Sequence, residues 1–430
     1  MSPINRQILH IAIPSIISNI TVPLLGLVDV TIVGHLGSAS YIGAIAVGGM
    51  LFNMIYWIFG FLRMGTGGLT AQAYGQHNTQ EGTRILLRSL SVSLLLALVL
   101  LVLQYPIRLI AFMLIDASPE VQELATRYFH ICIWGAPATL GLYSFTGWFI
   151  GMQNSRYPMY IAITQNIVNI AASLFFVFVL HMKVEGVALG TLIAQYAGVI
   201  MAYLLCISHY HPFRQQVQRM QLLERNAMKR FFLVNRDIFL RTLCLVAVTV
   251  FFTSTGATYG DVVLAVNTLL MQLFTLFSYI MDGFAYAGEA LSGKYTGSND
   301  KIRLHQTVRN LFGWGSAMAL LFTLTYLWGG QDFLQLLTND TEVIAASGTY
   351  LLWTVAIPFC GFSAFILDGI CIGTTSTRIM LKSMATASAL FFGVYFLCSG
   401  SWGNHALWMA FLVYLAVRGL IQGYLLRNKI

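Results

Sequence analysis

Charged side chains are scarce in this sequence: Asp, Glu, Lys and Arg make up only 9% of 430 residues, whereas soluble domains contain about 25%. By contrast, 57% of the residues are hydrophobic and the mean hydropathy is +0.73. No long polar stretch separates the hydrophobic segments, so we expect no extramembrane domain. This composition excludes a soluble globular protein.

Cysteine is also scarce, and its pattern excludes two kinds of site. The six cysteines all lie within hydrophobic segments and form no C-x-x-C pair, so we expect small apolar core residues. The nine histidines show no H-E-x-x-H or comparable pair. The sequence therefore predicts neither a metal site nor an enzyme, and no bound cofactor is expected.

Twelve hydrophobic segments are long enough to cross a bilayer as helices, for which about 20 residues suffice. The first is too long for the hydrophobic region of a signal peptide and lacks a small-residue cleavage site, so we expect a retained helix. The predicted spans are 9–33, 42–68, 84–104, 123–150, 158–180, 187–209, 237–257, 262–290, 306–328, 344–372, 379–399 and 404–426.

The formal net charge of +8 could suggest a nucleic acid partner, but in a membrane protein the distribution of Lys and Arg decides. With the N-terminus inside, these residues fall at cytoplasmic loops or helix ends, except Arg108, Arg127 and Lys183 outside and Arg63 within a span. This pattern predicts that both termini are cytoplasmic. The positive charge should then meet anionic lipid, and no nucleic acid partner is expected.

The second half of the chain repeats the first at an offset of 222 residues. The matches include Leu69 with Leu291, Gly75 with Gly297, Glu120 with Glu342, Val121 with Val343, Tyr128 with Tyr350, Gly147 with Gly369, Gly151 with Gly373, and Arg156 with Arg378. Each copy holds six spans, an even number, so both copies enter the membrane in the same orientation. We therefore predict an all-α membrane protein with two six-helix bundles, related by a pseudo-two-fold axis along the membrane normal.

This repeat sets the predicted domains. Residues 1–210 form an N-terminal lobe, 211–236 a basic cytoplasmic linker, and 237–430 a C-terminal lobe. Two such lobes leave a cleft that can open to either side of the membrane, which is typical of transporters.

Ionisable residues within spans are costly, at about 3 kcal/mol each, and therefore indicate function. Five occur: Asp29, Arg63, Asp282, Glu289 and Asp368. For Glu289 and Asp368, which are close to predicted cytoplasmic ends, placement at the headgroups is the alternative. Asp29 lies deeper and could bind a proton or hold Na⁺.

Pro23 and a group of polar residues in the fifth span bear on the role of Asp29. Pro23 removes a backbone hydrogen bond in the same helix, so we expect a hinge there. The fifth span places Asn166, Asn169 and Ser173 close to one face. These polar groups either join helices or form a hydrated, ion-coupling pocket with Asp29, and the spacing leaves both possibilities open.

The eighth span carries seven polar residues on one helical face, which should meet water or protein rather than lipid. They are Thr268, Gln272, Thr275, Tyr279, Asp282, Tyr286 and Glu289. The equivalent face of the second span is mostly apolar and includes Met50, Asn53, Trp57 and Met64. These two faces, with Arg63 and Asp368, are the predicted substrate cavity. They suit an organic cation with an apolar body, although Met and Trp at this spacing also fit ordinary helix packing.

Four segments resemble one family of transporters. Asp29-Val-Thr-Ile-Val-Gly-His-Leu-Gly37 is similar to the first-helix signature of the multidrug and toxic compound extrusion (MATE) family. The segments 282–290, 367–373 and 403–408 resemble its DNA-damage-inducible (DinF) branch. The resemblance covers essentially the whole chain.

The resemblance implies H⁺- or Na⁺-coupled efflux of drug-like small molecules from the bacterial inner membrane, with a cavity around Asp29. We expect a monomer. Many relatives carry a second acid in the fifth helix, where this chain has Ser173. Asp29 is then the only acid in the interior of its lobe, and neither the coupling ion nor the physiological substrate follows from the sequence.

The main alternative is a lipid-linked oligosaccharide flippase of the same superfamily. Such a protein should have a more basic cavity for the pyrophosphate of its substrate, whereas Arg63 is the only cation predicted within a span. Drug efflux is therefore the favoured interpretation.

Overall fold

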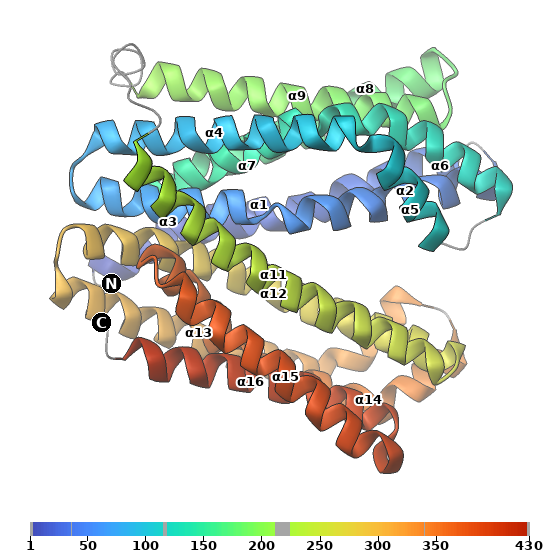
Figure 1. Ribbon diagram of the computed structural model, residues 1–430. Coiled ribbons are helices and arrows are strands. Elements are labelled where there is room, and N and C mark those ends of the chain that lie inside the picture. Colours follow the sequence, from blue (N-terminus) through green and yellow to red (C-terminus); the bar gives the residue numbers. More distant parts are fainter. Residues whose placement is uncertain (1–2, 36, 115–117, 211–223, 339, 428–430) are drawn as a thin grey trace. The chain divides into compact units, whose positions relative to one another are not determined.

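The computed structural model describes residues 3–35, 37–114, 118–210, 224–338 and 340–427. Within these ranges the chain is almost entirely helical, with short turns between the helices, and contains no strand (Figure 1). This architecture confirms the predicted all-α class. Part of the predicted basic linker, 211–223, lies outside the described residues.

Eleven helical segments among the described residues are long and apolar enough to cross a membrane. The predicted span at 123–150 differs because it consists of two shorter helices, α6 (Pro119–Cys132) and α7 (Ala136–Gly151), joined by a 3₁₀ turn at Ile133–Gly135. Proline follows at the start of α7, where its missing N–H is tolerated. The two pieces together account for the twelfth predicted crossing.

Contacts divide the chain into two compact units. The first unit is Ile17–Phe231, and the second unit is Met1–Ile16 with Phe232–Ile430. These bounds differ from the predicted lobes because the first turns of α1 (Pro3–Gly34) belong to the second unit and those of α11 (Arg225–Thr258) to the first. The described end of the predicted linker is thus the start of a long helix.

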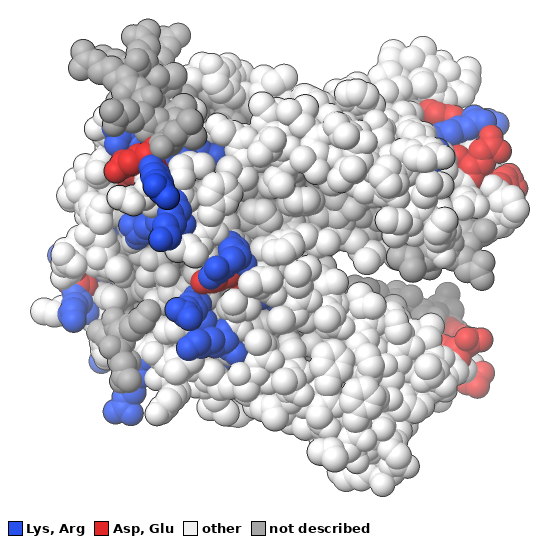
Figure 2. All heavy atoms as spheres, in the orientation of Figure 1, with Lys and Arg blue, Asp and Glu red and all other residues white. Residues whose placement is uncertain are grey.

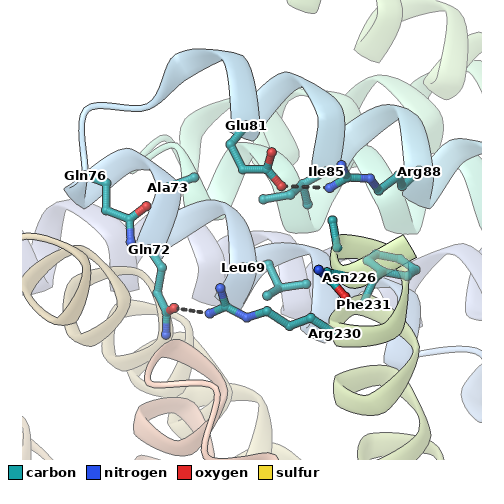
Figure 3. A pocket seen from close by; sticks show the side chains of 11 residues that line it. Leu69, Gln72, Ala73, Gln76, Glu81, Ile85, Arg88, Asn226, Arg230 and Phe231 are labelled. Carbon is teal, nitrogen blue, oxygen red and sulfur yellow. Dashed lines mark hydrogen bonds and ion pairs between the residues drawn. The ribbon is translucent and has the colours of Figure 1, made fainter. Parts of the chain in front are cut away.

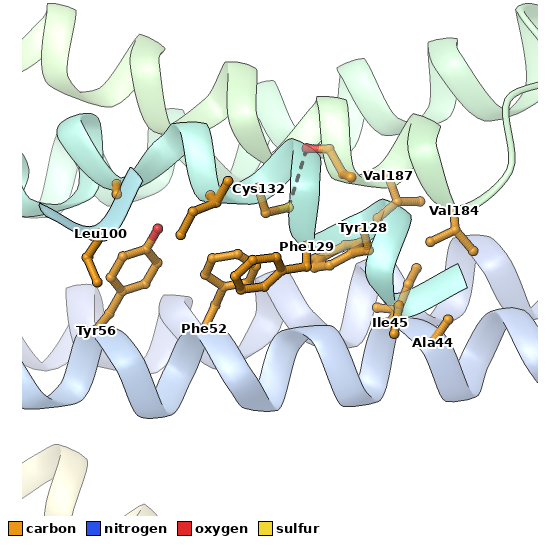
Figure 4. Close-up of a cluster of buried hydrophobic side chains, with 14 of the residues drawn as sticks. Ala44, Ile45, Phe52, Tyr56, Leu100, Tyr128, Phe129, Cys132, Val184 and Val187 are labelled. Atoms are coloured by element: carbon orange, nitrogen blue, oxygen red, sulfur yellow. Dashed lines mark hydrogen bonds between the residues drawn. The ribbon is translucent and has the colours of Figure 1, made fainter. Parts of the chain in front are cut away.

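The first unit contains the rest of α1 and eight further segments. They are α2 (Ala39–Ile58), α3 (Phe61–Gly75), α4 (Thr79–Val102), α5 (Gln104–Leu114), α6, α7, α8 (Arg156–Leu174), which ends in a π-helical turn at Phe175–Val179, and α9 (Val184–His209). Its core joins α2, α6 and α9 (Figure 4). The rings of Phe52 and Phe129 stack there with centroids 5.3 Å apart, an arrangement that fixes α6 against α2.

The second unit contains the corresponding helices. They are α11, α12 (Asp261–Gly297), α13 (Lys301–Leu337), α14 (Thr341–Gly373), α15 (Thr377–Trp402) and α16 (Asn404–Leu426). Aromatic contacts join them, such as Phe252 with Trp408 at 5.0 Å between centroids. Cysteine packs as expected in both units: Cys132, Cys206 and Cys371 are buried and the other three are partly buried, all as free thiols.

The 222-residue repeat extends to the backbone of the turns. Non-helical turns with positive φ occur at His77 and Asn299, both with φ 55°, at Gln153 (64°) and Thr375 (53°), and at His181 (53°) and Gly403 (50°). Each pair is separated by the same offset. Helix caps repeat too, because Asn78 accepts the backbone N–H of Glu81 and Asp300 accepts that of Arg303, both at 2.9 Å.

Glycines at equivalent positions bring helix backbones into contact. A Cβ at Gly147 of α7 would collide with the carbonyl oxygen of Arg63 in α3. A Cβ at Gly369 of α14 would collide in the same way with the carbonyl oxygen of Ala285 in α12. The same close contact therefore joins the second and fourth spans of each copy, and only glycine fits it.

Charged side chains gather at the ends of the helices. Within each unit, Figure 2 shows most visible Lys and Arg near one end and Asp and Glu mainly near the other. This separation is the pattern on which the predicted orientation rests. The side of the membrane on which the termini lie stays a prediction.

Candidate functional site

Asp29 lies in α1 at the centre of a polar network in the first unit. Its carboxyl group is buried, with only 3% of the residue exposed. The hydroxyl of Thr191 in α9 donates to Asp29 Oδ2 at 3.2 Å, and Asn169 Nδ2 in α8 donates to that same hydroxyl oxygen at 3.0 Å. The network therefore links three helices through one acid.

Three buried oxygens in this region form no hydrogen bond with the described residues. They are Asp29 Oδ1, Asn169 Oδ1 and Ser173 Oγ. Ser173 is fully buried, one helical turn beyond Asn169, and it packs against Gly190, the residue before Thr191. Leaving a buried acceptor without a donor costs about 1–3 kcal/mol, so this cluster is suited to receive a proton or a cation.

Asn166 has a different environment from Asn169. Its Nδ2 donates to the backbone oxygen of Thr21 in α1 at 3.2 Å and to that of Ala162 at 3.0 Å. Of the two roles that the spacing left open, Asn166 thus joins helices, while Asn169 lies in the network of Asp29. The α1 contact is two residues before Pro23, and α1 remains helical through that proline.

Asp368 is the centre of a second buried cluster, in the second unit. It forms ion pairs with Arg241 of α11 and Arg418 of α16, and Gln422 Nε2 donates to its Oδ1 at 2.6 Å. All four side chains are buried. Asp368 is therefore held by protein groups in the interior of its unit.

This cluster overturns the expectation that Arg63 is the only cation within a span. Arg241 and Arg418 lie inside the spanning helices α11 and α16 and are only 7% and 3% exposed. The positive-inside pattern predicts both arginines at cytoplasmic helix ends. One signal was available in the sequence: Arg418 and Gln422 are one turn apart on the same helix face.

Two other predicted site residues are also buried within their own units. Arg63 lies in α3 and Glu289 in α12, and Glu289 has no exposed surface. Glu289 is therefore surrounded by protein groups.

The predicted substrate residues vary in exposure. On α2, Met50 and Trp57 are 46% and 43% exposed, and Asn53 is exposed as well. Met64 of α3 and Tyr279, Asp282 and Tyr286 of α12 are partly buried, and Gln272 is exposed. The exposure of these residues is known only within their own units. Their contact with a substrate therefore stays a prediction.

Two six-helix copies in the membrane, with buried carboxylates in the spanning helices, are features of a secondary transporter. The sequence model of the MatE family matches residues 14–175 and then again residues 238–396. The chain therefore belongs to the MatE family, whose members are multidrug and toxic compound extrusion transporters. The two matched regions correspond to the two copies of the internal repeat.

Individual relatives agree with this assignment. The chain is 39% identical to DNA damage-inducible protein F of Escherichia coli (strain K12), over 97% of this chain and 90% of the relative. It is 23% identical to the probable multidrug resistance protein NorM of Photorhabdus laumondii, over 87% of this chain and 83% of that protein.

Solved structures show the same fold. A MATE protein crystallised in a bent conformation matches with a TM-score of 0.87 at 18% identity, over 100% of this chain and 96% of the other. The Vibrio cholerae MATE transporter VcmN, also in a bent form, matches with a TM-score of 0.86 at 17% identity, over 99% and 98% of the two chains.

Proposed function

We propose that this protein exports lipophilic, cationic small molecules across the bacterial inner membrane, with both termini in the cytoplasm, in exchange for an inward-moving ion by alternating access. The buried carboxyl group of Asp29, with an oxygen that accepts no hydrogen bond from the described residues, is the observation that carries the proposal. The name of one relative, a probable multidrug resistance protein, supports export of drug-like molecules.

Of the two possible coupling ions, H⁺ suits this site better than Na⁺. A proton needs one oxygen lone pair, which Asp29 Oδ1 supplies. Na⁺ would need several oxygen ligands at once, and would have to draw on the neutral oxygens of Asn169 and Ser173 in addition to the one carboxylate. Protonation would also remove the charge that Thr191 stabilises, and so change the network that joins α1, α8 and α9.

Pro23 supplies a place where α1 can respond to that change. Asn166 holds α1 at Thr21, before the proline, while the Asp29 network holds it after the proline. Release of the second attachment would leave α1 free to bend at Pro23, since the helix lacks a backbone hydrogen bond there. We infer that this bend links ion binding to the substrate site.

The substrate side of the proposal rests on the two predicted faces. In the second unit, Tyr279, Asp282 and Tyr286 of α12 offer groups that can pair with a cationic centre. In the first unit, Met50 and Trp57 of α2 offer an apolar and adaptable surface. Met and aromatic side chains adapt to different shapes, which suits a transporter of several compounds.

A flippase for lipid-linked oligosaccharides is less well supported. Its pyrophosphate substrate requires arginines that are available to bind it, and two of the buried arginines, Arg241 and Arg418, are both engaged by Asp368.

The test is dye efflux in inverted membrane vesicles, with a pH gradient and a Na⁺ gradient applied separately. We expect the pH gradient alone to drive uptake of a cationic dye into the vesicles. Dye uptake driven only by the Na⁺ gradient would show that Na⁺, and not H⁺, is the coupling ion. Dye movement that neither gradient accelerates would contradict ion-coupled export altogether.

A further inference from the structure

A cavity of ≈ 260 Å³ in the first unit lies apart from the Asp29 network (Figure 3). Its walls come from the end of α3, the start of α4 and the first turns of α11. The proposed transport reaction uses none of these side chains. The cavity is therefore a separate place to look for a ligand.

Two arginines line this cavity from different helices. Arg88 of α4 is only 3% exposed, and its Nη1 bonds to Glu81 Oε1 at 2.7 Å. Arg230 of α11 is exposed, and its Nη2 donates to the amide oxygen of Gln72 at 2.6 Å. Since that oxygen carries no charge, the lining has two cations and one carboxylate, and its net charge is positive.

Neutral hydrogen-bonding groups stand beside these charges. The side chains of Gln72, Gln76 and Asn226 all line the cavity, and amide N–H groups donate to anionic oxygens. Guanidinium groups bind phosphate with strong, charge-assisted hydrogen bonds. This combination is suited to a phosphate group and unsuited to the cationic substrates of the proposed transport.

Apolar side chains complete the lining and lead towards the lipid-facing surface. Leu69, Ile85 and Phe231 lie on the cavity wall. Along α4, the strongly exposed Leu94 and Leu95 begin six residues beyond Arg88, which is about 9 Å at the rise of an α-helix. That separation is close to the depth of one headgroup layer of a bilayer, about 5–8 Å.

We propose that this cavity binds a phosphate group, held between Arg88 and Arg230, and that its source is the headgroup of an anionic phospholipid. Such a ligand would fasten the first turns of α11 to α3 and α4. The proposal does not depend on the coupling ion or the transported substrate, because binding can be measured without transport.

The test is binding of phosphatidylglycerol or phosphatidylcholine to the purified full chain. Native mass spectrometry monitors how much of each lipid stays bound. We expect the wild type to retain phosphatidylglycerol preferentially, and Arg230→Gln to lower that affinity about tenfold, as expected for the loss of one charge-assisted bond. Arg303→Gln is the matched control, because it removes an equal charge from an exposed side chain of the second unit. It should bind like the wild type.

A second variant keeps the arginine and adds a negative charge beside it. Gln72→Glu would place a carboxylate against Arg230 and should also weaken binding of phosphatidylglycerol. Displacement of the lipid by inorganic phosphate at millimolar concentration would support the phosphate site and assign it to a soluble anion. Equal binding by the wild type and Arg230→Gln, or equal retention of the two lipids, would overturn the proposal.

Discussion

Asp29 and Asp368 are both buried acids, but their partners differ in charge. Asp29 accepts a hydrogen bond from the neutral hydroxyl of Thr191. Asp368 is bound by two guanidinium groups and one amide. A carboxyl group with neutral partners can exchange a proton without breaking an ion pair. Protonation of Asp368, by contrast, would leave two buried cations without their counter-charge. We therefore assign ion exchange to Asp29 and a structural role to Asp368.

Replacement of Asp368 by Asn should destabilise the protein strongly. The change leaves Arg241 and Arg418 buried beside a neutral amide, and breaking a buried ion pair costs about 3–5 kcal/mol. Thermal unfolding in detergent measures the loss. The control is Asp332→Asn, an exposed acid of α13, whose effect should stay within about 0.5 kcal/mol. Similar unfolding temperatures for the two variants would show that the cluster contributes little.

Ser173 stands where the resemblance to the MATE family implies a second acid, and it is fully buried near Asn169. With one acid in this network, we expect the substrate release rate to depend on external pH with the slope of a single proton. Ser173→Asp should make that dependence steeper, because two nearby carboxyl groups titrate as a pair.

The measurement for Ser173 is the efflux rate as a function of pH at fixed membrane potential, with Ser173→Asn as the neutral control of similar size. A two-proton slope in the wild type would mean that another acid takes part, with Glu289 as the first candidate.

At the scale of helices, the same close contact between two helices occurs once in each copy of the repeat. Gly147 brings α7 against the backbone of α3, and Gly369 brings α14 against α12. By contrast, Gly393 lies within α15 with no atom near the position that a Cβ would take. These glycines therefore make opposite contributions, although all three occupy helix interiors.

Substitution of these glycines by Ala should separate close packing from helix propensity. We expect Gly147→Ala and Gly369→Ala to lower the free energy of unfolding by about 1–3 kcal/mol, because the helices must move apart. Gly393→Ala should raise it by about 0.5–1 kcal/mol, since Ala is the better helix former. Urea unfolding of the three variants in the same detergent tests this order. A higher free energy of unfolding for Gly147→Ala would contradict the close contact between α7 and α3.

The scaffold of these elements could be predicted well because its signals are local or periodic. Hydropathy located the spans, and the 222-residue offset predicted two copies of one unit. The structure repeats turns and caps at the same offset, such as the caps at Asn78 and Asp300. The break between α6 and α7 was missed because the hydrophobic run continues through Ile133 and Trp134. Pro137 was the available sign of that break.

The polar sites were less predictable because their partners are distant in sequence. Asp368 meets Arg241, 127 residues away, and Arg418, 50 residues away. The positive-inside pattern assigned both arginines to the cytoplasmic surface, and only the helix packing shows that they turn into the protein. Asp29 was identifiable because an acid is rare within a span, but its hydroxyl partner Thr191 had not been singled out.

For the molecule as a whole, the two copies share a scaffold and differ in their ionisable chemistry. The position equivalent to Asp29 is Phe251, which packs among aromatic residues of α15, and the position equivalent to Asp368 is Thr146. Under the proposed role of Asp29, ion binding is confined to one copy, and a transport cycle must transmit its effect to the rest of the protein. We infer that α1 does so, because it carries both Asp29 and Pro23.

The central claim is that Asp29 couples ion movement to export, and Asp29→Asn in reconstituted vesicles tests it most directly. Asn keeps the size of the side chain and can still bond to Thr191, so the variant should fold. We expect it to lose gradient-driven dye transport while it retains dye binding, and the exposed Asp261→Asn should transport like the wild type. Gradient-driven transport by Asp29→Asn at the wild-type rate would contradict the assignment of Asp29 as the coupling residue.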